Sequence, residues 1–397
     1  MRAIALALLI LVATAGGAAA AVPDDLSADP VERGVLLALP SVYRVKATIR
    51  VDRIRLADGQ VLTMPPGGRE ISEVGTAVAV TPDGWLVTAA HVAAPDRATV
   101  ARLAYQTREA FRGNRGHSDE QAAREWVAQH GAVALPGTVT ETVVTPASVD
   151  GTMVEQRAYR GMDTRRSNTA DLALVRIPVQ RAPAVALDDA RSTGTPIATI
   201  GFSGGDHLLT PDGPEGQATV RRGVIRTSGT LEDTTPRARP GFVVSAGVQS
   251  GDSGGPVVDE DGAVRGIVIQ RSDTGGGIAE TATEVRDLLQ QQGLESQSGA
   301  TAESFHTAMT ALWRLDLGAA ERSFVTTLRA YPQHALASRE LARSRALAAS
   351  PFALRADDRR QGILLGVAVL AIVAAAACAV ALARPTLGRP RGGAGGR

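Results

Sequence analysis

Three short strings contain residues whose types together can perform nucleophilic catalysis. TAAHV contains His91 at the end of an apolar run, DLALVRI opens on Asp171, and GDSGGPVV holds Ser253 among glycines. A serine hydroxyl is a poor nucleophile at neutral pH, so it needs an imidazole to accept its proton and a carboxylate to orient that imidazole. Asp163 and Asp150 are alternative carboxylates, but the DLALV string favours Asp171. We therefore expect a triad of His91, Asp171 and Ser253.

The glycines around Ser253 indicate how a reacting carbonyl would be bound. Glycine at positions 251, 254 and 255 lets the backbone approach a substrate with no side chain in the way. The amides of Gly251 and Ser253 can then point at a developing oxyanion, and losing one such donor typically costs on the order of 100- to 1,000-fold in rate. We expect these two amides to form an oxyanion hole.

Together, these strings resemble the chymotrypsin-fold (trypsin-like) serine proteases, and among them the cysteine-free bacterial HtrA/Deg type. The chain order His, Asp, Ser is that of chymotrypsin. The similarity covers roughly residues 40 to 292, through GTAVAVTPDGWLVTAAHV, DLALVRI, ATVRRGVIRTSG, SAGVQSGDSGGPVVDEDGAVRGIVIQ and GGGIAETATEVRDLL. The resemblance implies an all-β catalytic domain of two antiparallel six-stranded β-barrels, with His91 and Asp171 on the first and Ser253 on the second. It implies peptide-bond hydrolysis in the cleft between them, on a protein or peptide substrate, with no metal and no cofactor.

The same resemblance implies a pocket for the substrate side chain before the scissile bond. Its residues would come from the segment before the nucleophile and from two later segments: Gly247, Val248, Gln249, Ile269, Gln270, Arg271 and Gly277. The floor of this pocket would lie near Gly247, and no acidic residue is found there. We therefore expect small or medium apolar side chains to be accepted and Arg or Lys to be disfavoured.

Asp252 departs from the HtrA-type pattern, which usually has Asn before the serine. In the trypsin branch, this Asp pairs with a newly cut amino terminus, so activation by cleavage is one alternative. The mature chain would start near Val22, about 70 residues before His91, which is longer than that branch needs. No cleavage site stands out either, and these observations favour a protease without zymogen control.

Composition and charge exclude several other classes of protein. The 42 basic and 41 acidic residues leave a net charge of +1, so no overall field would attract nucleic acid. An apolar content of 44% is enough for a buried core and excludes disorder for most of the chain. The single cysteine, Cys378, permits no intramolecular disulfide and no thiolate metal site.

Two apolar segments bracket the chain and predict export and membrane anchoring. Residues 1–21 read as a signal peptide, with cleavage after Ala20 or Ala21, and an uncleaved anchor is the alternative. Residues 362–383 carry no charge over about 33 Å of helix, enough to cross a bilayer, and are followed by a tail at 384–397. Either alternative places the bulk of the chain outside the cytoplasm, with the tail inside.

The chain between these segments divides into a β-rich part and a helical part. Short β-rich runs broken by turns predict the protease domain over residues 36–292, including a hairpin around Pro82-Asp83-Gly84. A capping box at Ser118–Gln121 and a stop at Gly131 predict a helix in an insertion at about 103–131. Residues 302–349 are predicted to be helical, either as a tetratricopeptide-like hairpin that docks a partner or self-associates, or as a stalk.

Two functions from different classes follow from these patterns. The first is a membrane-anchored, extracytoplasmic serine endopeptidase. The second is a scaffold or receptor that keeps the protease fold but binds peptides or partner proteins at the cell surface with little turnover. The complete set of triad residues favours the enzyme.

Overall fold

The computed structural model describes residues 29–114, 119–149, 152–153, 158–189, 192–203, 218–231, 239–272 and 275–349. By its contacts the chain separates into two units, Pro23–Ala342 and a second unit that joins Met1–Val22 with Arg343–Arg397. The predicted signal peptide, membrane span and tail lie outside the described residues. Within the described ranges, no helix is long and apolar enough to cross a membrane.

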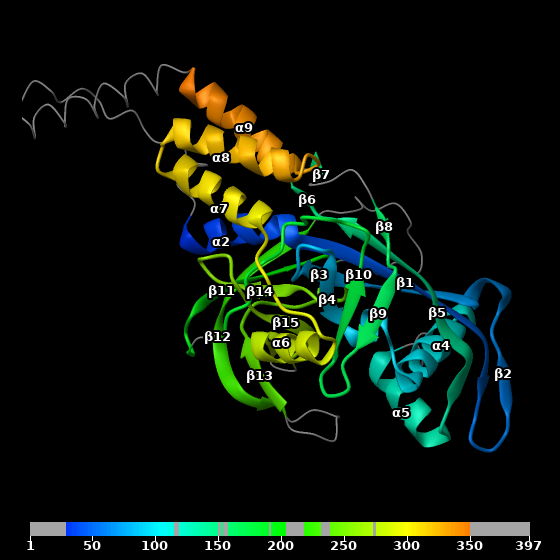
Figure 1. Ribbon diagram of the computed structural model, residues 1–397. Helices are drawn as coiled ribbons and strands as arrows, with labels where there is room; N and C mark the ends of the chain where they lie inside the picture. Colours follow the sequence, from blue (N-terminus) through cyan, green and yellow to red (C-terminus); the bar gives the residue numbers. More distant parts are fainter. Residues whose placement is uncertain are drawn as a thin grey trace, which may run out of the picture. The chain divides into compact units, whose positions relative to one another are not determined.

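The N-terminal half of the protease region is an open sheet. Its strands are β1 (Val42–Arg55), β2 (Val61–Thr63), β3 (Glu70–Ala79), β4 (Trp85–Ala89), β5 (Val133–Pro146), β8 (Tyr159–Arg160), β9 (Asp163–Arg166) and β10 (Leu172–Arg176). They lie in the order β8-β5-β1-β3-β4-β10-β9, with β2 paired to β1 (Figure 1). Strands β6 (Ser148–Val149) and β7 (Thr152–Met153) form a separate pair.

This sheet corrects the prediction of a closed six-stranded first barrel. Strands β1 and β5 are 14 residues each and pair along most of their length, with register shifts between Thr48 and Ile49 and again before Arg53. The edge strands β8 and β9 have only 2 and 4 residues, and within the described residues they do not pair with each other. The longest pairing of this sheet joins β1 and β5, and the described strands do not close into a barrel.

The hairpin predicted around Pro82-Asp83-Gly84 is confirmed as β3–β4. The two strands are antiparallel, with Ala79 opposite Leu86. Gly84 has a φ of +90°, a conformation that glycine adopts without steric cost. The turn sends β4 back through the core, where all five of its residues are buried.

The C-terminal half is a closed six-stranded barrel, as predicted. Its strands are β11 (Pro196–Gly201), β12 (Thr219–Leu231), β13 (Arg239–Val244), β14 (Pro256–Val258), β15 (Val264–Arg271) and β16 (Gly277–Thr281), in the order β11-β12-β13-β16-β15-β14. Helix α6 (Ala282–Gln291) follows directly, and the Thr281 side chain caps it by accepting from the Glu284 amide. Val285, Leu288 and Leu289 of this helix are buried.

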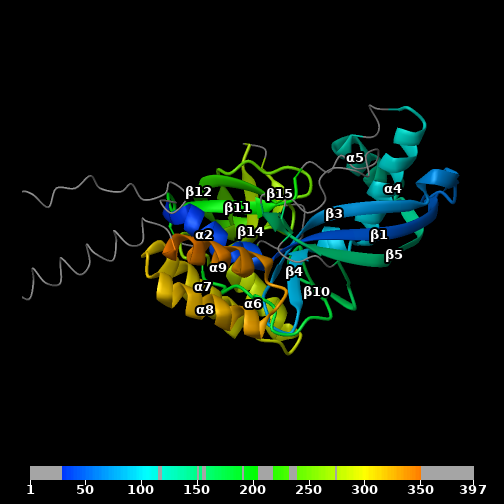
Figure 2. The same cartoon turned by 90° about the horizontal axis from the view of Figure 1, so that it is seen from above.

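The insertion after His91 contains two helices where one was predicted. After the single turn α3 (Ala90–Ala93) come α4 (Arg97–Phe111) and α5 (Glu120–His130), beside the far ends of β1 and β5 (Figure 2). Asp119 caps α5 through its side chain, and Gly131 ends it in the left-handed conformation. Ser118 of the predicted capping box lies outside the described residues. The two helices and the strand ends share a separate hydrophobic core that includes Ile49, Ile54, Tyr105, Ala123 and Val127.

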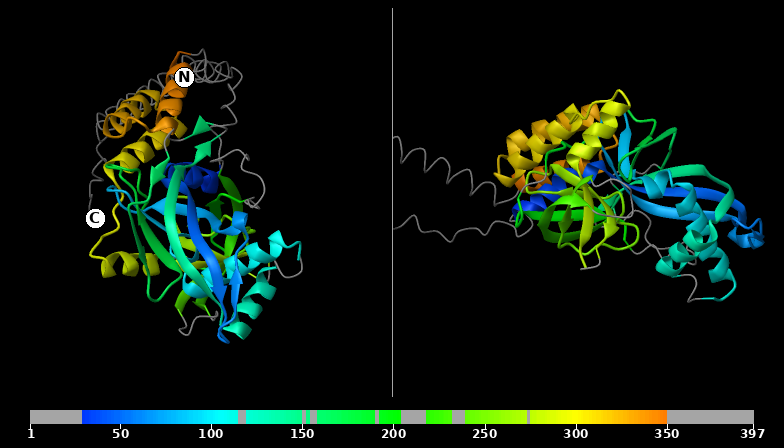
Figure 3. Two further views of the ribbon diagram at one scale, coloured as in Figure 1. Left: turned by 90° about the vertical axis from the view of Figure 1, so that its right-hand side faces the viewer. Right: turned by 90° about the horizontal axis from the view of Figure 1, so that it is seen from below.

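The remaining described helices lie outside the two sheets. They are α2 (Pro30–Ala38), the single-turn helices at Leu39–Ser41 and Pro66–Gly68, and α7 (Ala300–Trp313), α8 (Leu317–Ala330) and α9 (Ala335–Ala348). Helix α2 contacts β11, β14 and α7, and Figure 3 shows it between the barrel and α7. Between α7 and α8, the rings of Phe305 and Phe324 pack 6.2 Å apart.

Candidate active site

His91 and Asp171 form a close pair at the junction of β4, α3 and β10. The His91 Nδ1 atom lies 2.6 Å from Asp171 Oδ2. The other carboxylate oxygen, Oδ1, accepts from the His91 backbone amide at 3.1 Å. An imidazole that donates from Nδ1 leaves Nε2 unprotonated, which is the tautomer that a general base requires.

Backbone contacts fix the position of Asp171. Its carbonyl accepts from the Ala90 amide at 2.9 Å, so the residues before His91 and those that begin β10 are joined directly. Its amide lies 3.3 Å from Glu280 Oε1, and Glu280 belongs to β16 of the other half of the domain and is fully buried. The carboxylate that orients His91 is therefore held by both halves.

The electrostatic surroundings of His91 raise its pKa above the ordinary value. Burial of the ring acts to lower the pKa, but the Asp171 carboxylate outweighs it through its charge and its hydrogen bond, and Glu73 adds to the rise. Arg102 in α4 opposes it. Arg102 also pairs with Glu120 of α5 at 3.4 Å, so both insertion helices place charged groups near the catalytic histidine.

The Ser253 loop packs directly against the strands that lead to His91. The Ser253 carbonyl accepts from the Thr76 amide of β3 at 2.8 Å. Gly254 has a φ of +88°, and a β-carbon there would lie 2.9 Å from the Ala89 amide nitrogen and closer still to Thr76 and Thr88. Only glycine fits this contact. Among the described residues, the Ser253 hydroxyl has the Ile269 carbonyl as its hydrogen-bond acceptor, at 3.5 Å, and not the imidazole.

The backbone of this loop presents two free amides. Gly251 has a φ of +93°, and its carbonyl accepts from the Thr76 hydroxyl at 2.8 Å, which directs that carbonyl toward β3. The Gly251 and Ser253 amides donate to no acceptor within the described residues. Two unpaired N–H groups beside a serine hydroxyl are the donors that an oxyanion hole needs.

Asp252 lies beneath the loop in a buried ion pair. Its side chain is only 3% exposed and lies 2.7 Å from Arg221 Nη1 of β12. Its Oδ2 atom also accepts from the Gln249 amide at 2.9 Å. Burial raises the pKa of Asp252, while the Gln249 amide and the Arg221 charge act in the opposite direction.

The residues predicted to line the substrate pocket all lie on the C-terminal barrel, but not all are open to solvent. Gly247, Gln249, Gln270 and Arg271 are exposed, whereas Val248, Ile269 and Gly277 are buried. Arg271 pairs with Gly277 in the β15–β16 register. Val248 packs with the barrel core, where a β-carbon on Gly277 would lie 2.5 Å from its Cγ2 atom.

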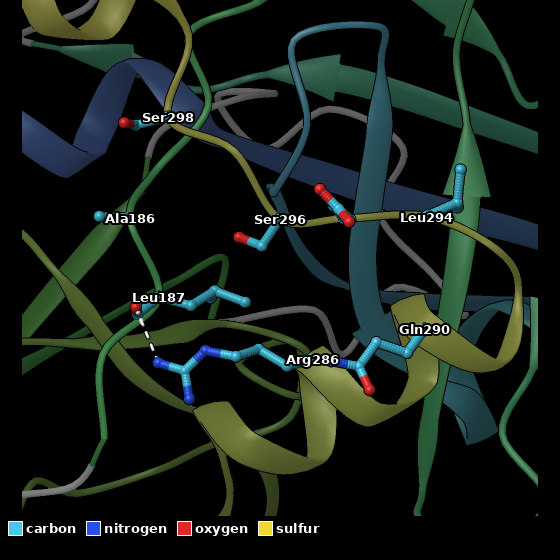
Figure 4. Close-up of a pocket in the computed structure, with 8 residues that line it drawn as sticks. Ala186, Leu187, Arg286, Gln290, Leu294, Ser296 and Ser298 are labelled. Carbon is cyan, nitrogen blue, oxygen red and sulfur yellow. Dashed lines mark hydrogen bonds between the residues drawn. The ribbon is translucent and has the colours of Figure 1, made fainter.

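A cavity in the described part of the chain lies apart from the three candidate catalytic residues. It has a volume of about 560 Å³ and is lined by residues before β11, by α6 and by the segment after α6. Figure 4 shows Arg286 in this cavity, donating to the Leu187 carbonyl at 2.9 Å. No triad or predicted pocket residue lines it. The described residues also include no group of three or more His, Cys, Asp or Glu side chains that could hold a metal ion.

Sequence reasoning missed Thr76, Arg221 and Glu280. Thr76 and Glu280 are completely buried. Two signals could have identified the first two. Thr76 is a polar residue in the otherwise apolar run GTAVAV, and an acid beside the nucleophile such as Asp252 needs a cation if it is buried. Glu280 gives no comparable signal, because its contact with Asp171 depends on how the two halves meet.

Comparison with known proteins places these residues in a recognised domain. The family model of the trypsin-like peptidase domain matches residues 75–267. Serine protease Rv3671c of Mycobacterium tuberculosis (strain ATCC 25618 / H37Rv) is 31% identical over 140 residues, which are 34% of this chain and 34% of that protein. Serine protease MT3772 of strain CDC 1551 / Oshkosh matches with the same values. The match spans about a third of the length of these curated relatives.

Solved structures resemble the chain more weakly. The active form of Rv3671c protease from M. tuberculosis has a TM-score of 0.43 and 19% identity, over 71% of this chain and 92% of that one. The HtrA-type protease AlgW with tripeptide has a TM-score of 0.41 and 20% identity, over 66% and 64%. At these scores the solved structures add nothing to the assignment, which comes from the family model and the motifs. Residues 75–267, which include His91, Asp171 and Ser253, match the family model of the trypsin-like peptidase domain.

Proposed function

We propose that this protein is a serine endopeptidase that hydrolyses peptide bonds through His91, Asp171 and Ser253, anchored in the membrane with its catalytic domain outside the cytoplasm. The observation that carries the activity is the 2.6 Å contact between His91 Nδ1 and Asp171 Oδ2, next to a serine loop with two free amides. These are the parts that acyl transfer by a serine nucleophile requires.

In the proposed mechanism, the Ser253 hydroxyl rotates away from the Ile269 carbonyl and attacks the scissile carbonyl carbon while His91 Nε2 accepts its proton. The oxyanion of the tetrahedral intermediate binds to the Gly251 and Ser253 amides. His91 then donates the proton to the leaving amine, and an acyl-enzyme on Ser253 remains. Water, deprotonated by His91, attacks the acyl carbon and releases the new carboxylate, while the proton returns to Ser253.

The test of this activity is covalent labelling of full-length protein in detergent with a fluorophosphonate, followed by profiling on a peptide library. We expect labelling at Ser253 and cleavage after Ala, Val or Leu. Arg and Lys should be rejected. The described neighbour of a β-carbon built on Gly247 is Arg221, and the Asp252 carboxylate beyond it is already paired with that arginine. A substrate cation would therefore be buried without a partner, which costs several kcal/mol. A profile dominated by Arg and Lys would overturn the specificity, and absence of labelling and cleavage would favour the scaffold function.

The membrane anchor is a separate part of the proposal. It is supported by the uncharged segment 362–383, which can insert far more firmly than a single lipid chain. We expect full-length protein to remain in the membrane fraction after carbonate washing, and truncation after Arg360 to release an active soluble protease. Added protease should digest the catalytic domain on intact cells. Soluble full-length protein, or a domain protected until lysis, would contradict this topology.

A further inference from the structure

The carboxylate of Asp252 is held by one charged side chain. Asp252 is 2% exposed, and a buried carboxylate is costly unless a cation and hydrogen bonds compensate it. Arg221 Nη1 lies 2.7 Å from its Oδ2 atom. The second Arg221 nitrogen, Nη2, donates to Ser203 Oγ at 2.8 Å. The guanidinium is therefore fixed at two points, although it comes from a strand 31 residues earlier in the chain.

The neighbouring arginine on the same strand has different partners. Successive side chains of a strand point to opposite faces, and Arg222 forms ion pairs with Asp29 and Glu32 at the start of α2. These three side chains are exposed, whereas Arg221 is 23% exposed and its partner Asp252 is 3% exposed. Arg221 alone of the two reaches the loop beneath Ser253.

The ion pair is connected to the oxyanion donors through three short contacts. Asp252 Oδ2 accepts from the Gln249 amide at 2.9 Å, and the Gln249 carbonyl accepts from the Asp252 amide at 3.1 Å. These two hydrogen bonds join the residues before and after Gly251. The Gly251 carbonyl itself accepts from the Thr76 hydroxyl of β3. The residues on both sides of the Gly251 amide are thus held, through Gln249 and Asp252 by the ion pair and through the Gly251 carbonyl by β3.

We propose that Arg221 is a positioning residue, whose guanidinium is the permanent cation that fixes Asp252. By fixing Asp252, Arg221 forms the oxyanion hole without any cleavage of the chain. This inference rests on the proposed endopeptidase activity. It means that Asp252 has a cation as its partner without a newly cut amino terminus.

The stem of Arg221 also borders the predicted substrate pocket. A β-carbon built on Gly247 would have the Arg221 Cδ atom as its nearest neighbour, at 3.9 Å. The same side chain therefore forms part of the wall where the pocket floor was predicted and holds the loop that carries the nucleophile. This position further disfavours a basic substrate side chain.

The test compares Arg221→Gln with Arg222→Gln in the full-length protein. Both variants remove one positive charge from β12, but only the first affects Asp252. We expect Arg221→Gln to lower kcat on the order of 100-fold, comparable to the loss of one oxyanion donor, with little change in KM. It should weaken a peptide aldehyde inhibitor, whose adduct places an oxygen in the oxyanion hole, by a similar factor. Arg222→Gln should retain the wild-type kcat.

Second-site variants separate positioning from a general effect on folding. Arg221→Lys keeps a cation and should retain most of kcat. In Arg221→Gln with Asp252→Asn, the buried charge is gone, so kcat should recover about tenfold or more from the Arg221→Gln value, since neighbouring groups are not additive. If Arg221→Gln fails to fold, the same double variant should restore folded, fluorophosphonate-reactive protein.

Three results would overturn the proposal: wild-type kcat in Arg221→Gln, an equal loss in Arg222→Gln, or a double variant no better than Arg221→Gln. Failure of the underlying activity gives a different pattern, because wild-type protein and Arg222→Gln would then also fail to react with the fluorophosphonate.

Discussion

Replacing Ser253 with alanine should abolish fluorophosphonate labelling and lower kcat on the order of a million-fold, as for other serine nucleophiles. The fold should be unaffected. The Ser253 side chain makes a single hydrogen bond, 3.5 Å long, to the Ile269 carbonyl, whereas its backbone contact with Thr76 remains in the variant. The change in unfolding free energy should therefore stay within about 0.5 kcal/mol. Hydrolysis of a library-derived peptide and thermal unfolding measure the two effects.

A matched control is available three residues earlier. Ser250 lies in the same loop and is exposed, and it has no part in the proposed chemistry, so Ser250→Ala should keep full activity. His91→Ala should be nearly as severe as Ser253→Ala, and the two together no worse than either, because triad residues act as a unit. Equal residual cleavage in Ser253→Ala and wild-type protein would refute the nucleophile.

Asp171→Asn should lower kcat about 10,000-fold, a magnitude taken from the chymotrypsin-type triad. An amide at this position can donate to His91 Nδ1, which would favour the tautomer with the proton on Nε2 and so remove the general base. Asp163→Asn is the matched control. Asp163 is partly exposed on β9 and paired with Arg165 at 2.9 Å, and its loss should leave kcat unchanged. Loss of activity in Asp163→Asn but not in Asp171→Asn would reassign the carboxylate.

The Asp171→Asn variant also tests whether Asp171 raises the pKa of His91, through the pH dependence of kcat/KM. Activity requires neutral His91, so kcat/KM should fall as the pH drops below the pKa of this residue. Because the Asp171 carboxylate helps to raise that pKa, the fall in wild-type protein should occur above the ordinary imidazole value of about 6.5. In Asp171→Asn the residual activity should persist to lower pH. A midpoint that does not move would mean that Asp171 does not set the His91 pKa.

The candidate catalytic residues could be identified in the sequence because each lies in a short local string. TAAHV, DLALV and GDSGGP identify residue types and chain order, and the 2.6 Å contact of His91 with Asp171 agrees with the roles expected from them. Arg221 and Glu280 could not be predicted, because their contacts join residues that are far apart in the sequence. Arg221 reaches Asp252, and Glu280 reaches the Asp171 amide, across 31 and 109 positions of the chain, which local patterns do not encode.

The fold was predictable where a turn is strong, as in the β3–β4 hairpin, and where the family resemblance implied it, as in the C-terminal barrel. The open N-terminal sheet was not. Its shape depends on how far β1 and β5 pair with each other. Their register shifts three times, and the alternation of apolar and polar side chains in the sequence does not predict such shifts. Helix α4 was also missed, although Asp96 caps it through its side chain directly after a proline.

The separate core of the insertion has a consequence for local stability. Helices α4 and α5 pack on the far ends of β1 and β5 through their own set of buried side chains, distinct from the core beneath the triad. Regions that share few buried contacts can open independently. Amide protons of α4 and α5 should therefore exchange with solvent through partial openings that leave β3, β4 and β10 closed. The helices beside the catalytic histidine then form a cooperative unit that can loosen or be remodelled while the catalytic residues keep their geometry.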